Sequence, residues 1–192
     1  MGKVSIKDSN TYCPQPMYLY GTYKENGDPN YGLFCWCTYC FVEEMKFVAC
    51  IGEDKLTRDL IRKNGVFSAT IVTEELLAEA DWCGTHPGYE FDKSNRIESE
   101  KGAVLNVPVP KKSIWTLELQ IDCTLRPSEN YNSDIYICSI KNVLADERLT
   151  DKNLSFEEKL KLAKPVVTMA GKYIPAELRS LGDWGTMNET IK

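Results

Sequence analysis

The sequence predicts a mainly β protein, an antiparallel barrel with a few short peripheral helices. Strand-like segments follow one another through turn-rich joints, and few helical patterns lie between them. Parallel strands need a long crossover connection, usually a helix, and that alternation is not evident. Neither a Gly-x-Gly-x-x-Gly fingerprint nor a P-loop occurs, which argues against a Rossmann dinucleotide domain. Because no linker or repeat divides the chain, we expect a single domain over residues 1–192.

The first half of the chain predicts a meander of strands. Residues 14–16 favour an extended entry, and the tyrosine-rich residues 17–24 have the composition of a strand. The turn that follows contains Asn26-Gly27, a pair that readily takes the positive φ angles of a tight hairpin. Two more strands are expected after this turn, at residues 31–42 and 46–51.

Three helices are expected among the remaining strands. Thr57 is expected to cap a helix that ends at Asn64-Gly65, and Thr73 to cap a helix over residues 74–82 that Gly84 ends. Ser155 and Glu158 have capping-box spacing for a third helix, which Pro165 terminates. The polar residues 85–102 lack a period, so we expect a long functional loop there. The other strands are expected at residues 66–72, 115–125, 134–145 and 166–173.

The charge of the chain excludes several classes of partner. Its net charge is −5 and its pI is about 5.1, a field that repels polyphosphate and anionic membrane surfaces. No run reaches the ~20 apolar residues that a membrane helix requires. The first residues lack the apolar core of a signal peptide. We therefore expect a cytoplasmic protein that binds neither nucleic acid nor membrane.

Eight cysteines are an unusual number for such a chain. An even count can indicate a disulfide framework, but that inference applies to short secreted proteins. Most of these cysteines lie in apolar runs, where a reduced thiol packs as a small hydrophobe. We expect reduced, buried thiols, and the residues concerned are Cys13, Cys35, Cys37, Cys40, Cys50, Cys83, Cys123 and Cys138.

The spacing Cys35-x-Cys37-x-x-Cys40 could hold zinc or an iron–sulfur cluster. In a continuous strand, however, side chains alternate between faces, so Cys40 would point away from Cys35 and Cys37. No Gly or Pro breaks this segment. With a single histidine in the chain, no metal is expected.

Two runs carry residue types that suit a phosphorylated ring compound. Residues 30–38 combine aromatic side chains with thiols, a surface that fits a flat ring with polar edges. An ordinary aromatic core strand is the simpler reading of this run alone. Residues 52–61 place Lys55, Thr57 and Arg58 at the start of a helix, where unpaired N–H groups hold phosphate. A plain helix cap with solvated charges explains this run equally well, and Glu53-Asp54 would repel an anion.

A third run, residues 84–93, is a polar loop that contains Lys93. A lysine in such a loop is most often a surface charge. By itself this run therefore predicts no function.

Taken together and in order, these runs resemble the flavin reductase-like family of FMN-binding split barrels, especially its flavoredoxin branch. The likeness begins at Pro14-Gln15-Pro16 and Tyr20-Gly21-Thr22 and ends at Ile140-x-Asn142-Val143-x-Ala145-Asp146. Between them lie Asn30-x-Gly32-Leu33-Phe34-x-Trp36, Lys55-x-Thr57-x-x-x-Ile61, Val66-Phe67-Ser68, the loop of residues 84–93 and Gly102-x-x-Leu105-Asn106-Val107-Pro108.

The resemblance implies a split β-barrel, a Greek-key antiparallel barrel, that forms a homodimer with FMN in a groove at the subunit interface. It implies that the flavin ring is lined by Asn30, Phe34, Cys35, Trp36, Cys37 and Thr38, and that Cys50 also belongs to the cofactor site. Lys55 and Thr57 would hold the phosphate end, and Lys93 would approach the cofactor from its loop. No catalytic side chain is assigned, since the cofactor supplies the chemistry. The chain departs from its relatives at Ser133-Asp134, where they often carry a histidine, and at the acidic pair Glu53-Asp54.

Three functions are compatible with this resemblance. The first is a flavin reductase that transfers hydride from NADH or NADPH to FMN. The alternative is an electron carrier like flavoredoxin, with tightly bound FMN that is reduced by another redox protein. The third is a binding module that keeps the barrel without the cofactor, because a fold does not fix a function.

Overall fold

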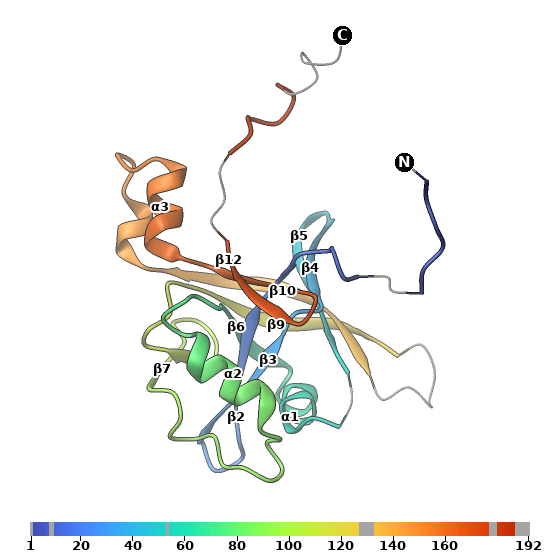
Figure 1. The fold of residues 1–192 in the computed structure, drawn as a ribbon. Coiled ribbons are helices and arrows are strands. Elements are labelled where there is room, and N and C mark those ends of the chain that lie inside the picture. The colour runs from blue at the N-terminus through green and yellow to red at the C-terminus, as the bar shows by residue number, and fades with distance from the viewer. Residues whose placement is uncertain (1, 8–9, 53, 127–132, 177–179, 187–192) are drawn as a thin grey trace.

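The computed structural model describes residues 2–7, 10–52, 54–126, 133–176 and 180–186. Strands dominate, and three α-helices and one 3-10 helix accompany them in the described part of the chain (Figure 1). The mainly β class is therefore confirmed. The strands are β1 (Gln15–Pro16), β2 (Tyr18–Tyr23), β3 (Pro29–Phe34), β4 (Cys37–Val42), β5 (Glu44–Ile51), β6 (Val66–Ile71), β7 (Ser99–Lys101), β8 (Pro108–Pro110), β9 (Trp115–Leu125), β10 (Asp134–Ala145), β11 (Val166–Met169) and β12 (Lys172–Pro175). The helices are α1 (Leu56–Asn64), α2 (Leu77–Thr85), η1 (Glu147–Thr150) and α3 (Phe156–Ala163).

The central sheet has seven antiparallel strands in the order β3-β2-β6-β9-β10-β5-β4. Its two edge strands, β3 and β4, follow each other in the chain with only Cys35 and Trp36 between them. In a flat sheet these edges would lie ~29 Å apart, six strand spacings of ~4.8 Å. Three Cα–Cα steps of ~3.8 Å span at most ~11 Å. The sheet must therefore curl until its edges approach each other, which makes it a barrel with a split between β3 and β4.

This topology corrects the prediction of one strand at residues 31–42. The chain forms β3 and β4 instead, although neither Gly nor Pro occurs from Leu33 to Val42. The break arises because the chain changes partner, from β2 before Cys35 to β5 after Trp36. The carbonyl of Trp36 accepts a hydrogen bond of 2.8 Å from the N–H of Cys50, which fixes the start of the new pairing. Cys35 therefore lies outside the strand, contrary to the prediction, whereas Cys37 and Cys40 still lie on opposite faces of β4.

The strand predicted at residues 166–173 is also two strands. β11 and β12 form a hairpin whose turn, Ala170-Gly171, has φ angles of 53° and 68°. β1 pairs with the other side of β11 to complete a three-stranded sheet. By contrast, β9 and β10 have the bounds that the sequence predicts.

The helix ends match the sequence only in part. Lys55, not Thr57, is the N-cap of α1, and no side chain caps this end, whereas Gly65 ends the helix in a left-handed conformation as expected. Thr73 does not cap α2 either, because a turn precedes the helix and Gly84 lies inside it. The predicted capping box of Ser155 and Glu158 on α3 is confirmed.

Two apolar clusters hold these elements together. The barrel interior contains aromatic rings, with Tyr20 stacked on Phe34 at 4.7 Å and edge-on to Phe67. The second cluster lies where α2 packs on β3, and its buried side chains include Tyr31, Leu76 and Cys83 (Figure 1). Phe34 thus anchors the end of β3 to the core immediately before the chain leaves the strand.

All eight cysteines are free, but their burial differs from the prediction. Only Cys83 and Cys138 are buried; Cys13 and Cys123 are exposed, and the other four are half-buried. The expectation that most of them pack in the core was therefore wrong. Within the described ranges, no three His, Cys, Asp or Glu side chains are grouped so that they could hold a metal ion. No helix in these ranges is long and apolar enough to cross a membrane.

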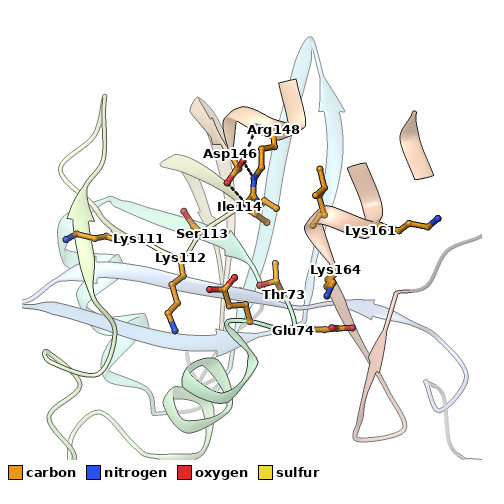
Figure 2. A pocket seen from close by; sticks show the side chains of 13 residues that line it. Thr73, Glu74, Lys111, Lys112, Ser113, Ile114, Asp146, Arg148, Lys161 and Lys164 are labelled. Atoms are coloured by element: carbon orange, nitrogen blue, oxygen red, sulfur yellow. Dashed lines mark hydrogen bonds and ion pairs between the residues drawn. The ribbon is translucent and has the colours of Figure 1, made fainter. Parts of the chain in front are cut away.

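A hollow of about 720 Å³ lies between the start of α2, the turn before β9, η1 and α3 (Figure 2). Lys111, Lys112, Lys161 and Lys164 border it, but so does the Glu74 carboxylate. Asp146 also lines it and is bound by Arg148 through hydrogen bonds of 2.8 and 2.9 Å. Charges of both signs are therefore interleaved, and none of the predicted site residues lies here.

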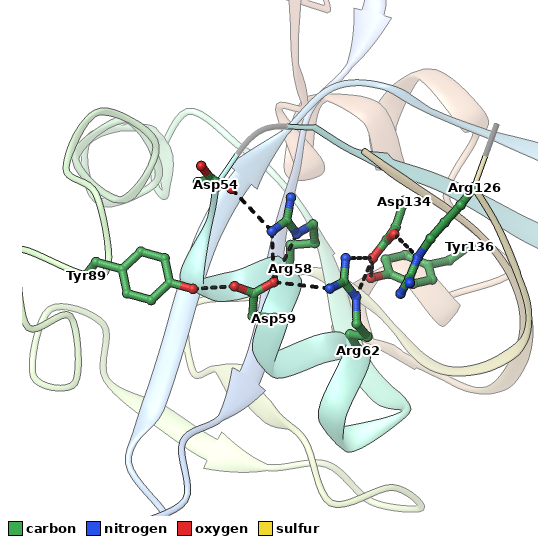
Figure 3. A network of polar contacts seen from close by, with 8 residues as sticks. All are labelled: Asp54, Arg58, Asp59, Arg62, Tyr89, Arg126, Asp134 and Tyr136. Atoms are coloured by element: carbon green, nitrogen blue, oxygen red, sulfur yellow. Dashed lines mark hydrogen bonds and ion pairs between the residues drawn. The ribbon is translucent and has the colours of Figure 1, made fainter. Parts of the chain in front are cut away.

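Charged side chains on α1 form a network with the start of β10 (Figure 3). The carboxylate of Asp134 is 1% exposed and accepts hydrogen bonds from Arg62, Arg126 and the hydroxyl of Tyr136, all between 2.6 and 2.8 Å. Burial alone would raise the pKa of Asp134, but these bonds outweigh it and lower the pKa. Asp134 therefore links α1 to the start of β10.

We expect Asp134→Asn to destabilise the fold by roughly 2 kcal/mol at pH 7, because bonds to a charged acceptor are lost while both arginines remain partly solvated. A carboxylate with a lowered native pKa stabilises the fold above its unfolded pKa, and this contribution is lost as the pH falls through the native value. The wild type should therefore lose stability more steeply than the variant below a pH of ~4. Urea unfolding from pH 7 to pH 3 measures this. Asp183→Asn, at an exposed position, is the control, and equal pH slopes in D134N and wild type would contradict the assignment.

Candidate cofactor-binding site

A cavity of about 360 Å³ lies where β3 leaves the sheet, and we call it the first cavity. One wall is the end of β3 and the break after it, with Leu33, Phe34, Cys35 and Trp36. Cys50 and Gly52 extend this wall from the end of β5, and Lys55 lies at the start of α1. The opposite wall comes from α2 and the β11–β12 hairpin. The complete lining is Met17, residues 33–36, Cys50, Gly52, Lys55, Asp81, Gly84, Thr85, Thr168, Gly171 and Tyr173.

Five of the predicted site residues line this cavity: Phe34, Cys35, Trp36, Cys50 and Lys55. Trp36 keeps 54% of its surface exposed, although it is a large apolar side chain. The break between β3 and β4 explains this exposure, since Trp36 belongs to neither strand. The cavity thus joins a flat apolar surface to a lysine at the N-terminal end of α1.

Two further predicted residues, Cys37 and Thr38, line a neighbouring cavity of about 370 Å³, which we call the second cavity. Its described lining consists of residues 13–16, Tyr18, residues 35–39 and Phe47. Cys35 and Trp36 belong to both linings. The break in the chain therefore forms a wall between two adjoining hollows.

Asn30 and Thr57 are buried and line neither cavity. The Nδ2 of Asn30 donates a hydrogen bond of 2.9 Å to the hydroxyl of Thr57, which ties β3 to the first turn of α1. The Oδ1 of Asn30 is buried without a hydrogen-bond partner. A side chain at Gly32 would place its Cβ 2.8 Å from the Thr57 hydroxyl, so the two elements meet closely at this point. These residues position the start of α1 from behind the cavity.

Lys93 is also buried, with only 3% of its surface exposed. Its Nζ donates to the carbonyls of Cys83, at 2.6 Å, and Tyr31, at 3.2 Å. Burial lowers the pKa of Lys93, and the nearby charge of Lys55 lowers it further. Two lysines therefore contribute positive charge at this end of the first cavity.

Asp54, whose charge was expected to oppose an anion, lies 3.5 Å from the guanidinium of Arg58 (Figure 3). Asp54 does not line the first cavity. Glu53, the other member of the acidic pair, lies outside the described residues.

The wall formed by α2 and the C-terminal hairpin contains residues that sequence reasoning missed. The hydroxyl of Tyr173 donates to the carboxylate of Asp81 across this wall. Burial and this hydrogen bond raise the pKa of Tyr173 to about 12. Thr85 and Thr168 add hydroxyl groups. No local pattern marks these positions, because only tertiary packing brings α2 and β11–β12 together.

Comparisons with known proteins agree with this architecture. A family model described as flavin reductase like domain matches residues 10–173. The comparison with curated proteins finds no match. A flavoredoxin structure from Methanosarcina acetivorans is 20% identical, with a TM-score of 0.85 over all of both chains.

Two further structures share the fold. An FMN-binding protein from Thermus thermophilus, solved with bound p-hydroxybenzaldehyde, is 19% identical, with a TM-score of 0.76 over 95% of this chain and 98% of that one. A structure from Shewanella frigidimarina, described as a flavin reductase with a split barrel domain, is 13% identical, with a TM-score of 0.78 over 92% and 89%. The predicted split barrel and the flavoredoxin resemblance are thus confirmed. With a family model that covers most of its length, the chain belongs to the flavin reductase-like domain family.

Proposed function

We propose that the chain binds FMN in the first cavity, with the ring against Phe34 and Trp36 and the phosphate toward Lys55. The observation that carries this proposal is the lining of the cavity, in which an apolar aromatic wall adjoins a lysine at a helix start. A flat ring with polar edges and a terminal phosphate needs both features. The exposed face of Trp36 supports the same placement.

The start of α1 suits the phosphate. α1 has nine residues and no side-chain cap at Lys55, and the positive end of its dipole favours an anion. Lys93 adds charge from behind, where its only hydrogen bonds among the described residues go to carbonyls. An ammonium group buried without a carboxylate is costly, and a bound phosphate would offset that cost.

FMN, when bound, carries the electrons, and the chain holds the ring and excludes water. We propose an electron carrier of the flavoredoxin kind as the main function, supported by the full-length match to a flavoredoxin. Its donor would be another redox protein. A flavin reductase that uses NADH or NADPH is the second candidate, which the description of the matching family favours.

We also propose that a second copy of the chain completes the site, as in the homodimer that the resemblance implies. The first cavity, at about 360 Å³, is near the lower limit of ~300 Å³ for ligand pockets. The edge strand β4 and its turn to β5 expose Tyr39, Phe41, Val42 and Met45. An exposed apolar strand edge favours pairing with another chain.

We expect the purified protein to show flavin absorption or to take up added FMN. Trp36→Ala should weaken FMN binding about tenfold, or ~1.4 kcal/mol, because the stacking surface is removed. Trp184→Ala, at a fully exposed tryptophan, is the matched control. Titration of the apoprotein, followed by visible absorption, gives both affinities. Equal affinities for W36A and wild type would place the ring elsewhere.

The two redox functions differ in their turnover. A carrier with tightly bound FMN should fail to oxidise NADH or NADPH steadily, even with excess FMN, while a reductase should turn over. Loss of absorbance at 340 nm measures this. A colourless protein that takes up no FMN would leave only a binding module on the same barrel.

We expect Phe41→Lys to convert the dimer to a monomer and to weaken FMN binding, because a charge enters the apolar edge of β4. Phe156→Lys, at an exposed phenylalanine of α3, is the control and should stay dimeric. Sedimentation equilibrium gives the mass of each variant. A dimer that persists unchanged in F41K would show that this edge is not the interface.

A further inference from the structure

The side chains that line the second cavity differ in charge from those that line the first. Of the described residues that line it, none carries a formal charge, although 27% of the chain is charged. The first cavity contains both Lys55 and Asp81. An ion that left water for the second cavity would meet no counter-charge among these residues, which disfavours its binding. The second cavity therefore favours a neutral ligand.

The walls of this cavity are aromatic and held in fixed positions. The ring of Phe47 packs edge-on against Tyr18 at 5.3 Å and against Tyr39 at 5.5 Å. The hydroxyls of Tyr18 and Tyr39 lie 3.4 Å apart. Trp36 adds a fourth aromatic side chain. Tyr18 and Phe47 are buried, at 5% and 0% exposed. The accessible ring surface therefore comes from Trp36 and Tyr39, to which a planar ring binds by stacking or edge contacts.

The remaining lining limits the polar contacts of a ligand to a few. Gln15 and Thr38 supply an amide and a hydroxyl, and Pro14 and Pro16 are apolar members of the same lining. A volume of about 370 Å³ has room for a small ring system. The class of ligand is then a flat, neutral aromatic molecule of one or two fused rings with one or two hydrogen-bonding oxygens.

We propose that the second cavity is a binding site for a neutral aromatic molecule, separate from the first cavity and divided from it by Cys35 and Trp36. Its binding depends only on the residues described above. Its role as a reactant beside bound FMN rests on the function proposed for the first cavity. A segment of a second copy of the chain could fill the same space, and the experiment includes that outcome.

The test uses 2,3-dimethyl-1,4-naphthoquinone, a neutral two-ring probe whose blocked ring positions cannot add to the thiols of Cys13, Cys35 or Cys37. Titrated into the full-length protein without FMN, it should quench tryptophan fluorescence to saturation with one molecule per chain by calorimetry. Naphthalene-2-sulfonate has the same fused rings with a negative charge, and it should bind about tenfold more weakly or not at all. Equal affinity for both probes, or no saturable binding of the quinone, overturns the proposal. The absence of saturable quinone binding would also follow if a segment of a partner chain filled the cavity.

Two filling variants assign the probe to its cavity. Gln15→Trp fills the second cavity alone, and Thr85→Trp fills the first alone. We expect Q15W to weaken quinone binding about tenfold or more and to keep FMN binding, and T85W to do the reverse. Loss of quinone binding in T85W, or its survival in Q15W, overturns the proposal. Circular dichroism checks folding, and Cys13→Trp, at an exposed position of the same lining, replaces Q15W if that variant unfolds.

The two proposals fail in different ways. A wild type that binds the quinone but not FMN contradicts the function proposed for the first cavity and keeps the second site. A wild type that binds FMN but not the quinone does the opposite.

Discussion

The short connection between β3 and β4 is the constraint on which the structure depends. Two residues must join strands that lie at opposite edges of a seven-stranded sheet. Closure of the sheet satisfies this constraint, and the two connecting residues then lie outside both edge strands. A tryptophan at such a point has no neighbouring strand to cover it, so its ring borders open space on either side. The barrel and both cavities thus have one origin.

The elements that sequence reasoning predicts well are those with local causes. β9 and β10 have the expected bounds, and Ser155 with Glu158 forms the expected capping box, because pattern and capping chemistry act over a few residues. The predictions of one strand at residues 31–42 and of one strand at residues 166–173 were wrong. In the first case the cause is a change of pairing partner, which lies far away in the sequence. In the second, the turn has Ala170 at positive φ, an unusual choice that gives no clear turn signal.

The candidate site shows the same difference between residues that local patterns predict and residues that only tertiary packing brings together. Residues 34–36, Cys50 and Lys55 line one cavity, and their roles in binding FMN stay predictions. Asp81 and Tyr173 reach the same cavity through tertiary packing alone. Asn30, Thr57 and Lys93 belong to the supporting layer, which sequence spacing cannot separate from the lining. The motif that begins at Gly102 has a structural cause instead. The buried carboxylate of Glu118 accepts the backbone N–H groups of residues 103–105, which holds that loop in place.

The lining of the first cavity has a consequence for the order of folding. Its walls come from the end of β3, from the β11–β12 hairpin and from segments between them, so the cavity needs contacts between residues more than a hundred positions apart. Contacts of this kind form late, since they must overcome the entropy of closing long loops. A ligand that binds there recognises the completed barrel and not its partly folded precursors. Such a ligand raises the melting temperature with its concentration, as any molecule does that binds the native state alone.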